Sequence, residues 1–250
     1  MTDSGSITLV PTVHYSPRHS DLVRETIREE QPDIVAVELD ARRFDRFREG
    51  RSIQLRTILE ELPPLAAATY AWLYLLQQTV VRLYGFDPNE TDMKTAIETA
   101  GAADIPVAPI DEPITDVLAE LSNRIGLAMG PKLLFRATDV QSRDVFEQFE
   151  ALVVPFRDVE SGEDVEPLIR QFRRYLPEVA EVLIDQRDQA MAERLHRLRA
   201  DGYDVVAVIG AGHHIGVRDT LQALDGSDAD QEVSVPIFDV EPPVTTIEVE

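Results

Sequence analysis

The sequence contains no cysteine, which excludes a disulfide-stapled scaffold of the secreted type. Lysine is nearly absent as well: Lys94 and Lys132 are the only two lysines among the 24 basic residues, so arginine supplies the other positive charges. The first six residues contain neither a basic stretch nor an apolar run, so we expect no secretory signal there. These absences favour a cytoplasmic protein.

Positive charge is scarce relative to negative charge. The 250 residues include 46 acidic and 24 basic side chains, which gives a formal net charge of −22 at pH 7. A field of that sign repels nucleic acid and anionic membrane surfaces, so we expect neither as a partner. An acidic surface with few lysines is typical of halophilic proteins from a high-salt cytoplasm, where salt screens the self-repulsion. Compositional drift is the alternative explanation.

One stretch of the chain lacks charge entirely. Residues 62–81 form an uncharged run that is long enough to be considered as a membrane span. The run begins with Leu-Pro-Pro and contains glutamine and threonine, and its apolar residues recur at helical spacing. This pattern predicts a helix at 65–84 that is buried or faces a partner, and a homodimer is one such arrangement. A membrane span or a peripheral membrane contact is the less favoured interpretation.

Short apolar strands alternate with helices, which predicts an α/β fold with a central, mainly parallel sheet flanked by helices. The first unit has a strand at 7–13, a helix from a Ser20 cap to about Gln31, and a strand at 34–37. Such a unit is right-handed, and we expect its two strands to lie side by side. We expect one domain over residues 1–250, with a helical middle section at about 53–200. The remaining expected elements are helices at 53–62, 65–84, 92–100, 114–121, 143–153, 165–199 and 217–223, a mobile loop at 156–165, and strands at 107–110, 205–209 and 233–239.

Two of the five histidines occupy matching places near opposite ends of the chain. His14 and His213 each follow a short apolar strand and precede a helix, and Glu38 directly follows the strand at 34–37. Ligands of an open parallel sheet bind at the carboxyl ends of its strands, so these three side chains converge if their strands are neighbours. Two imidazoles and a carboxylate suit a divalent transition metal (Mn, Co or Zn) with open positions for water and substrate.

Each of these residues also has a plainer interpretation. A histidine after a strand is often a structural hydrogen-bonding residue. Glu38 is either a general base for a bound water or a cap for the following helix, whose arginines would then form solvated ion pairs. The chain has no His-Glu-x-x-His spacing, so the spacing alone does not favour metal binding over these alternatives.

A charged cluster, Asp185-Gln186-Arg187-Asp188, lies in the expected long helix. Asp185 and Asp188 are three residues apart and share a helix face, whereas Arg187 lies off that face. The cluster is either a solvated helix face or the source of an arginine that neutralises an oxyanion. Asp111 follows the third strand at the same carboxyl edge, where it either adds negative charge near a metal or satisfies a helix N-terminus.

Four groups of short motifs follow one another between residues 7 and about 217. They are Thr12-Val13-His14-Tyr15-Ser16 with Pro32-Asp33-Ile34-Val35-Ala36-Val37-Glu38-Leu39-Asp40 and Arg43, then Gly85-Phe86-Asp87-Pro88 before Asp92-Met93-Lys94, then Asp185-Gln186-Arg187-Asp188, and last Gly210-Ala211-Gly212-His213. In this order they resemble the motifs of the TraB/PrgY (pheromone-shutdown) family. The resemblance covers nearly the whole chain.

The resemblance implies a fold and a chemistry. It implies kinship with the Tiki proteases and the erythromycin esterases (EreA/ChaN-like), hence an α/β fold of two related halves, each with a strand–x–x–His–helix unit. For Tiki-like members it also implies metal-dependent peptide cleavage. By position, the implied metal ligands are His14, His213 and Glu38, the implied catalytic residues are Glu38, Arg43 and Arg187, and the expected substrate-binding residues are Asp40, Asp111 and His214.

Three positions depart from the family pattern. Pro11 stands where the first motif has glycine, Gln186 replaces an acidic residue, and Glu112 replaces an arginine. Proline fixes φ and removes a donor, so the approach of the chain to His14 differs locally.

The leading hypothesis from the sequence is a metal-dependent hydrolase that acts on peptides, with a peptide or small molecule as substrate. Two alternatives remain. One is a non-catalytic protein of the same fold that captures a peptide or partner in signal or pheromone inhibition. The other is a metal-free, esterase-like hydrolase with histidine as the base.

Overall fold

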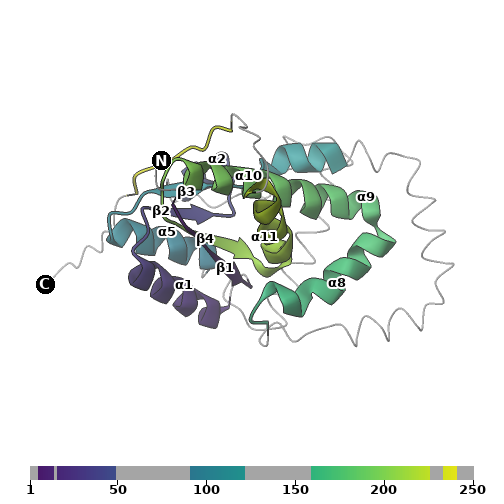
Figure 1. The fold of residues 1–250 in the computed structure, drawn as a ribbon, viewed down its shortest axis with the longest axis horizontal. Helices are drawn as coiled ribbons and strands as arrows, with labels where there is room; N and C mark the ends of the chain where they lie inside the picture. The colour runs from purple at the N-terminus through teal and green to yellow at the C-terminus, as the bar shows by residue number, and fades with distance from the viewer. Residues whose placement is uncertain (1–4, 14–15, 49–90, 122–158, 226–232, 241–250) are drawn as a thin grey trace, which may run out of the picture.

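The computed structural model describes residues 5–13, 16–48, 91–121, 159–225 and 233–240. Within these residues, one parallel sheet contains β1 (Ile7–Thr12), β2 (Ile34–Val37), β3 (Val107–Pro109) and β4 (Val205–Gly210) in the order β1-β4-β2-β3. Helices pack on both faces of the sheet (Figure 1). The α/β fold with a central parallel sheet flanked by helices is therefore confirmed.

The strand order differs from the prediction in one respect. β4 lies between β1 and β2, so the expectation that the first two strands pair directly is wrong. Ala207 of β4 aligns with Leu9 of β1 on one side and with Ala36 of β2 on the other. β2 and β4 are buried along their whole length, as inner strands covered on both faces are. β1 is at the edge, where the missing N–H of Pro11 is tolerated.

Two helical layers complete the core. α1 (Pro17–Glu30) and α5 (Asp92–Ala102) cover one face of the sheet, together with α2 (Ala41–Arg48). α10 (Gln186–Ala200) and α11 (Ala211–Asp225) cover the other (Figure 1). Side chains of a strand alternate between the two faces, so Val208 packs in the first layer and Ala207 in the second.

Two helices begin earlier than the sequence pattern predicted. α1 begins at Pro17 and its N-cap is Ser16 instead of Ser20, because proline is best tolerated in the first turn. α11 begins at Ala211 immediately after β4, whereas the pattern predicted a helix only at 217–223. His213 consequently lies in the first turn of a helix.

The region around the predicted loop and long helix is also rearranged. α8 (Gly162–Tyr175) begins within the expected loop 156–165, because a capping box of Ser161 and Asp164 satisfies its first turn. The predicted helix at 165–199 is interrupted after α8 and resumes as α9 (Pro177–Ala180), which leads through a π-helical turn (Glu181–Asp185) into α10. The break occurs at Leu176, with φ at −132°, because a residue before proline is disfavoured in the helical region.

The segment after α11 reaches the far edge of the sheet. The predicted strand at 233–239 is wrong: only Phe238 pairs, in an isolated antiparallel bridge to Val107 of β3, and Pro236 nearby has no N–H to extend the ladder. The Phe238 ring packs on Phe44 with a centroid distance of 5.0 Å. This segment therefore covers the open edge of β3.

The remaining predicted helices fall partly outside the described residues. Residues 114–121 are helical, as predicted. The predicted helices at 53–62, 65–84 and 143–153, with the proposed dimer surface, lie outside the described residues. Among the residues that are described, no helix combines the length and apolar character that a membrane crossing requires.

Candidate functional site

The carboxyl ends of β4 and β2 bring His213 and Glu38 together. Glu38 Oε1 lies 3.4 Å from His213 Nε2, and Glu38 Oε2 accepts a hydrogen bond of 2.6 Å from the backbone N–H of Gly210. Both side chains are buried. The convergence expected for neighbouring strands is therefore seen for these two residues, whereas His14 lies outside the described residues.

The guanidinium of Arg187 occupies the centre of this site. It donates to both carboxylate oxygens of Asp111, at 2.8 and 2.7 Å, and to Glu38 Oε1 at 2.6 Å. Its third nitrogen lies 3.2 Å from the Leu183 carbonyl oxygen and 3.1 Å from His213 Nε2. These contacts engage all five N–H groups of the arginine. Burial lowers the pKa of Arg187, but Glu38 and Asp111 outweigh that effect and raise it, so the cation is permanent.

The other nitrogen of the histidine contacts a buried carboxylate. His213 Nδ1 lies 2.6 Å from Asp188 Oδ1. The Arg187 guanidinium that faces Nε2 can only donate hydrogen bonds. Nε2 is therefore the acceptor, and the proton of the neutral ring is on Nδ1. Burial raises the pKa of Asp188, while the hydrogen bond to His213 opposes this shift. The pair therefore presents the Nε2 lone pair toward Glu38 and Arg187.

Arg43 and Asp40 border the site on the α2 side. Asp40 Oδ1 accepts a hydrogen bond from the backbone N–H of Arg43 and so caps the start of α2. The Arg43 guanidinium lies 3.9 Å from Asp111 Oδ2, and its side chain is 31% exposed. At that distance it makes no hydrogen bond to Asp111, so with respect to the described residues its guanidinium retains donors for a ligand.

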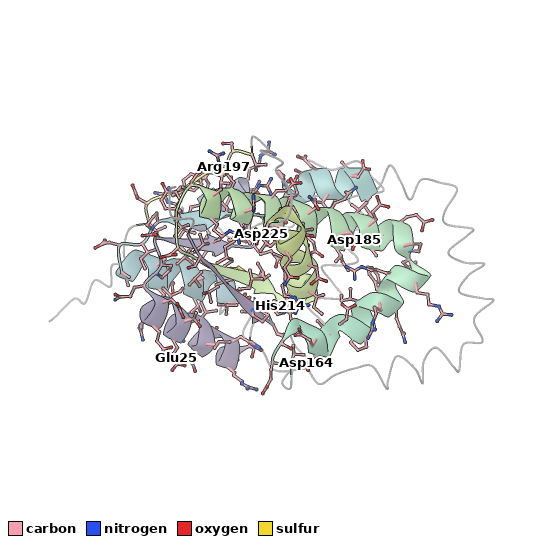
Figure 2. The ribbon with its side chains drawn as sticks, in the orientation of Figure 1. Glu25, Asp164, Asp185, Arg197, His214 and Asp225 are labelled. Carbon is pink, nitrogen blue, oxygen red and sulfur yellow. The ribbon has the colours of Figure 1, made fainter. Side chains whose placement is uncertain are left out.

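His214 lies apart from this cluster. Its Nδ1 accepts a hydrogen bond of 3.2 Å from the backbone N–H of Gly162, the first residue of α8. Figure 2 labels His214 on α11 and Asp164 near the start of α8, where the two helices meet. Burial lowers the pKa of His214, and its neutral ring acts as the acceptor. This hydrogen bond connects α11 to the first residue of α8. The expected contact of His214 with substrate stays a prediction.

A further buried carboxylate, which the sequence did not single out as a site residue, lies at the end of β1. Asp92, at the start of α5, is fully buried, and Asp92 Oδ2 accepts a hydrogen bond from the hydroxyl of Thr12. Ile209 on β4 also offers its carbonyl oxygen to that hydroxyl, at 3.2 Å. Asp92 belongs to one of the motifs that carry the family resemblance, which was the available signal.

The structure thus assembles Glu38, Asp111, Arg187 and His213, with Arg43 and Asp40 beside them. Among the described residues, no set of three histidine, aspartate or glutamate side chains is arranged to hold a metal ion. The chemistry that this arrangement supports directly is proton transfer at His213 Nε2 beside a fixed positive charge.

The chain is similar in sequence to a known protein family and to a known protein. The family model described as TraB/PrgY/gumN matches residues 1–229, a range that contains every residue of the site. An uncharacterized protein of Methanocaldococcus jannaschii is 30% identical over 227 residues, which is 90% of this chain and 55% of that protein. The chain therefore spans about half the length of this relative.

Proposed function

This chain belongs to the TraB/PrgY/gumN family, and on that premise we propose that it is a hydrolase for a peptide or small-molecule substrate. The contact between His213 Nδ1 and Asp188, at 2.6 Å, is the observation that supports the proposal most strongly. A carboxylate on one ring nitrogen fixes the tautomer and leaves the other nitrogen as a base. The two groups come from different helices, α11 and α10, and both are buried.

In the proposed reaction His213 Nε2 removes a proton from a water molecule that replaces its contact with Arg187. The hydroxide oxygen forms a bond to the substrate carbonyl carbon, and Asp188 stabilises the resulting imidazolium. The amide or ester bond then breaks, and His213 returns the proton to the leaving amine or alcohol. No redox partner is needed.

The arginines have different parts in this proposal. Arg187 donates to Glu38 and Asp111, so it holds both carboxylates in place and supplies a fixed positive charge, and only its N–H that faces His213 is released when the water enters. Arg43 has donors to offer and is the better candidate to stabilise the oxyanion. The sequence prediction of Arg187 as a direct oxyanion donor requires one of its present contacts to be exchanged for substrate.

A metal-dependent hydrolase is the second candidate, and one distance favours it. His213 Nε2 and Glu38 Oε1 are 3.4 Å apart. That spacing suits neighbouring ligands of a tetrahedral ion with bonds of about 2.0–2.1 Å. His213, Glu38 and the predicted His14 would hold Mn, Co or Zn, which supplies an activated water when bound. The Arg187 guanidinium contacts both described donor atoms, and its charge opposes a second cation there.

Untagged protein, assayed against a peptide library and simple esters, tests the proposal. We expect His213→Ala and Asp188→Asn to lower the turnover rate by about 10²–10⁴-fold, the usual contribution of an oriented general base. His196→Ala is the matched control, because His196 pairs with Asp225 away from this cluster, and it should leave turnover unchanged.

Metal analysis of the same preparations separates the two candidates. Turnover that survives chelation, in protein without bound transition metal, supports the metal-free hydrolase. Turnover that chelation abolishes and Mn, Co or Zn restores supports the metal-dependent one. Binding of peptides without any cleavage would contradict both and indicate a non-catalytic binding protein.

A further inference from the structure

A second arginine, Arg173 in the last turn of α8, reaches across to the helix that carries Asp188. Arg173 Nε and Nη2 lie 2.9 and 2.8 Å from Asp185 Oδ1, at the end of the π-helical turn. Nη2 also lies 3.9 Å from Asp188 Oδ2. Figure 2 labels Asp185 where α9 leads into α10, on the side of the molecule that α8 approaches. Arg173 therefore bridges two carboxylates on one face of the same helix.

The second carboxylate oxygen of Asp188, Oδ2, is buried, so a positive charge beside it stabilises the ionised carboxylate. The residue is 3% exposed, and no hydrogen-bond donor in the described part of the chain reaches Oδ2, although Oδ1 contacts His213. A buried carboxylate oxygen without a donor is costly unless a positive charge compensates it. Within the described residues, the permanent cation within 4 Å of this carboxylate is Arg173.

We propose that Arg173 is a positioning residue that holds Asp188 in the orientation required for its contact with His213. The proposal rests on the proposed function of His213 as the base. Among the described residues, Arg173 makes no hydrogen bond or ion pair with His213 or with the predicted substrate-binding side chains, so it acts through Asp188. Both Nε and Nη2 of Arg173 contact Asp185, which fixes the orientation of the planar guanidinium. The position of its positive charge beside Asp188 is therefore fixed as well.

The test uses nitrogen-15 histidine NMR of the full chain at one fixed pH, with His213→Ala to assign the signal. In the unaltered protein we expect His213 to show the tautomer with its proton on Nδ1. Arg173→Gln should shift the His213 signal toward a mixture of tautomers, and Arg173→Lys should restore it in part because the charge returns without the fork. Arg170→Gln is the matched control, since Arg170 is one turn earlier in α8, mostly exposed and paired with Glu166.

Kinetics provide the second measurement. Loss of an outer positioning contact typically costs about 10–100-fold, so we expect kcat to fall about tenfold in Arg173→Gln with KM within about twofold. Circular dichroism and thermal unfolding of each variant establish that it is folded. An unchanged His213 signal in folded Arg173→Gln overturns the proposal, as does an equal change in Arg170→Gln. A chain with no hydrolase activity refutes the proposed function instead, while the NMR comparison still decides the role of Arg173.

Discussion

Among single residues, Gly216 determines how closely Asp188 approaches α11. A Cβ at this position would lie 1.9 Å from Asp188 Oδ2 and 2.6 Å from its carboxyl carbon, so either the carboxylate or the helix must move. We expect Gly216→Ala to lower the free energy of unfolding by about 1–3 kcal/mol, the usual cost of overpacking, and to disturb the His213 contact. Urea denaturation and histidine NMR measure the two effects.

The same helix offers a control for that substitution. Among the described residues, a Cβ at Gly212 would meet Ile169 Cδ1 alone, at 3.6 Å, an ordinary contact. Gly212→Ala should leave stability unchanged or raise it by up to about 1 kcal/mol through helix propensity. Equal destabilisation by the two substitutions would show that close packing against Asp188 is not the cause.

The buried side chain of His19 makes the stability of the folded protein depend on pH. The side chain is 3% exposed, and burial lowers its pKa from the ordinary value of 6.5. Below pH 6.5 the unfolded chain therefore binds a proton that the folded chain resists, so the free energy of unfolding falls as the pH decreases toward the folded-state pKa. Well above pH 6.5 His19 is unprotonated in both the folded and the unfolded chain, so it contributes no slope there.

Urea unfolding of the protein and of His19→Gln between pH 5 and 8 measures this contribution. The variant should show a shallower loss of stability on the acid side, whatever its stability at pH 8. The burial of His196 and His214 also lowers their pKa values, so part of the slope should remain. Parallel curves for the two proteins would contradict the role of His19.

The contact between helices α8 and α11 depends on His214. Its Nδ1 accepts the Gly162 N–H, so His214→Ala removes the acceptor of a buried donor at the first residue of α8. A net loss of about 1 kcal/mol for this bond corresponds to about fivefold more frequent opening of α8. Hydrogen exchange should show faster exchange in residues 162–175 and unchanged exchange in α1. Equal acceleration of both helices would indicate global destabilisation instead.

The elements also show what the sequence could predict and what it could not. The strands were predictable because β2 and β4 are continuous apolar runs, the pattern of buried parallel strands. Their order was not, because nothing local in the sequence specifies that β4 enters between β1 and β2.

The candidate site was likewise predictable from the sequence only in part. The carboxyl-edge rule predicted that Glu38 and His213 would converge, since it needs only the strand ends. The family resemblance assigned Arg187 to the site, but the contact of Asp188 with His213 could not be assigned, because it depends on the helical phase set by the break at Leu176 and the π-helical turn. The shared face of Asp185 and Asp188 was visible in the spacing, but Arg173 as their common partner was not.

For the whole molecule, the charge imbalance governs the response to salt. The 46 acidic side chains exceed the 24 basic ones, so exposed ion pairs such as Arg18–Glu160 and Arg218–Glu163 leave a large excess of negative charge. Salt weakens each exposed pair, but such a pair is worth only about 0.2–1 kcal/mol. Repulsion within a chain of net charge −22 therefore dominates, and its screening stabilises the folded state.

We expect Tm to rise between 0.1 and 1 M KCl, as the screening length falls from about 10 Å to about 3 Å, and NaCl to act equally. Differential scanning calorimetry measures this shift. The same titration at pH 4.5, the isoelectric point calculated from the sequence, is the control, because protonation removes most of the net charge and should remove most of the salt effect. A Tm that falls with salt at pH 7 would show that ion pairs outweigh the repulsion. Salt also strengthens hydrophobic burial. An equal rise of Tm at both pH values would therefore show that hydrophobic burial, and not screening of the −22 charge, causes the stabilisation.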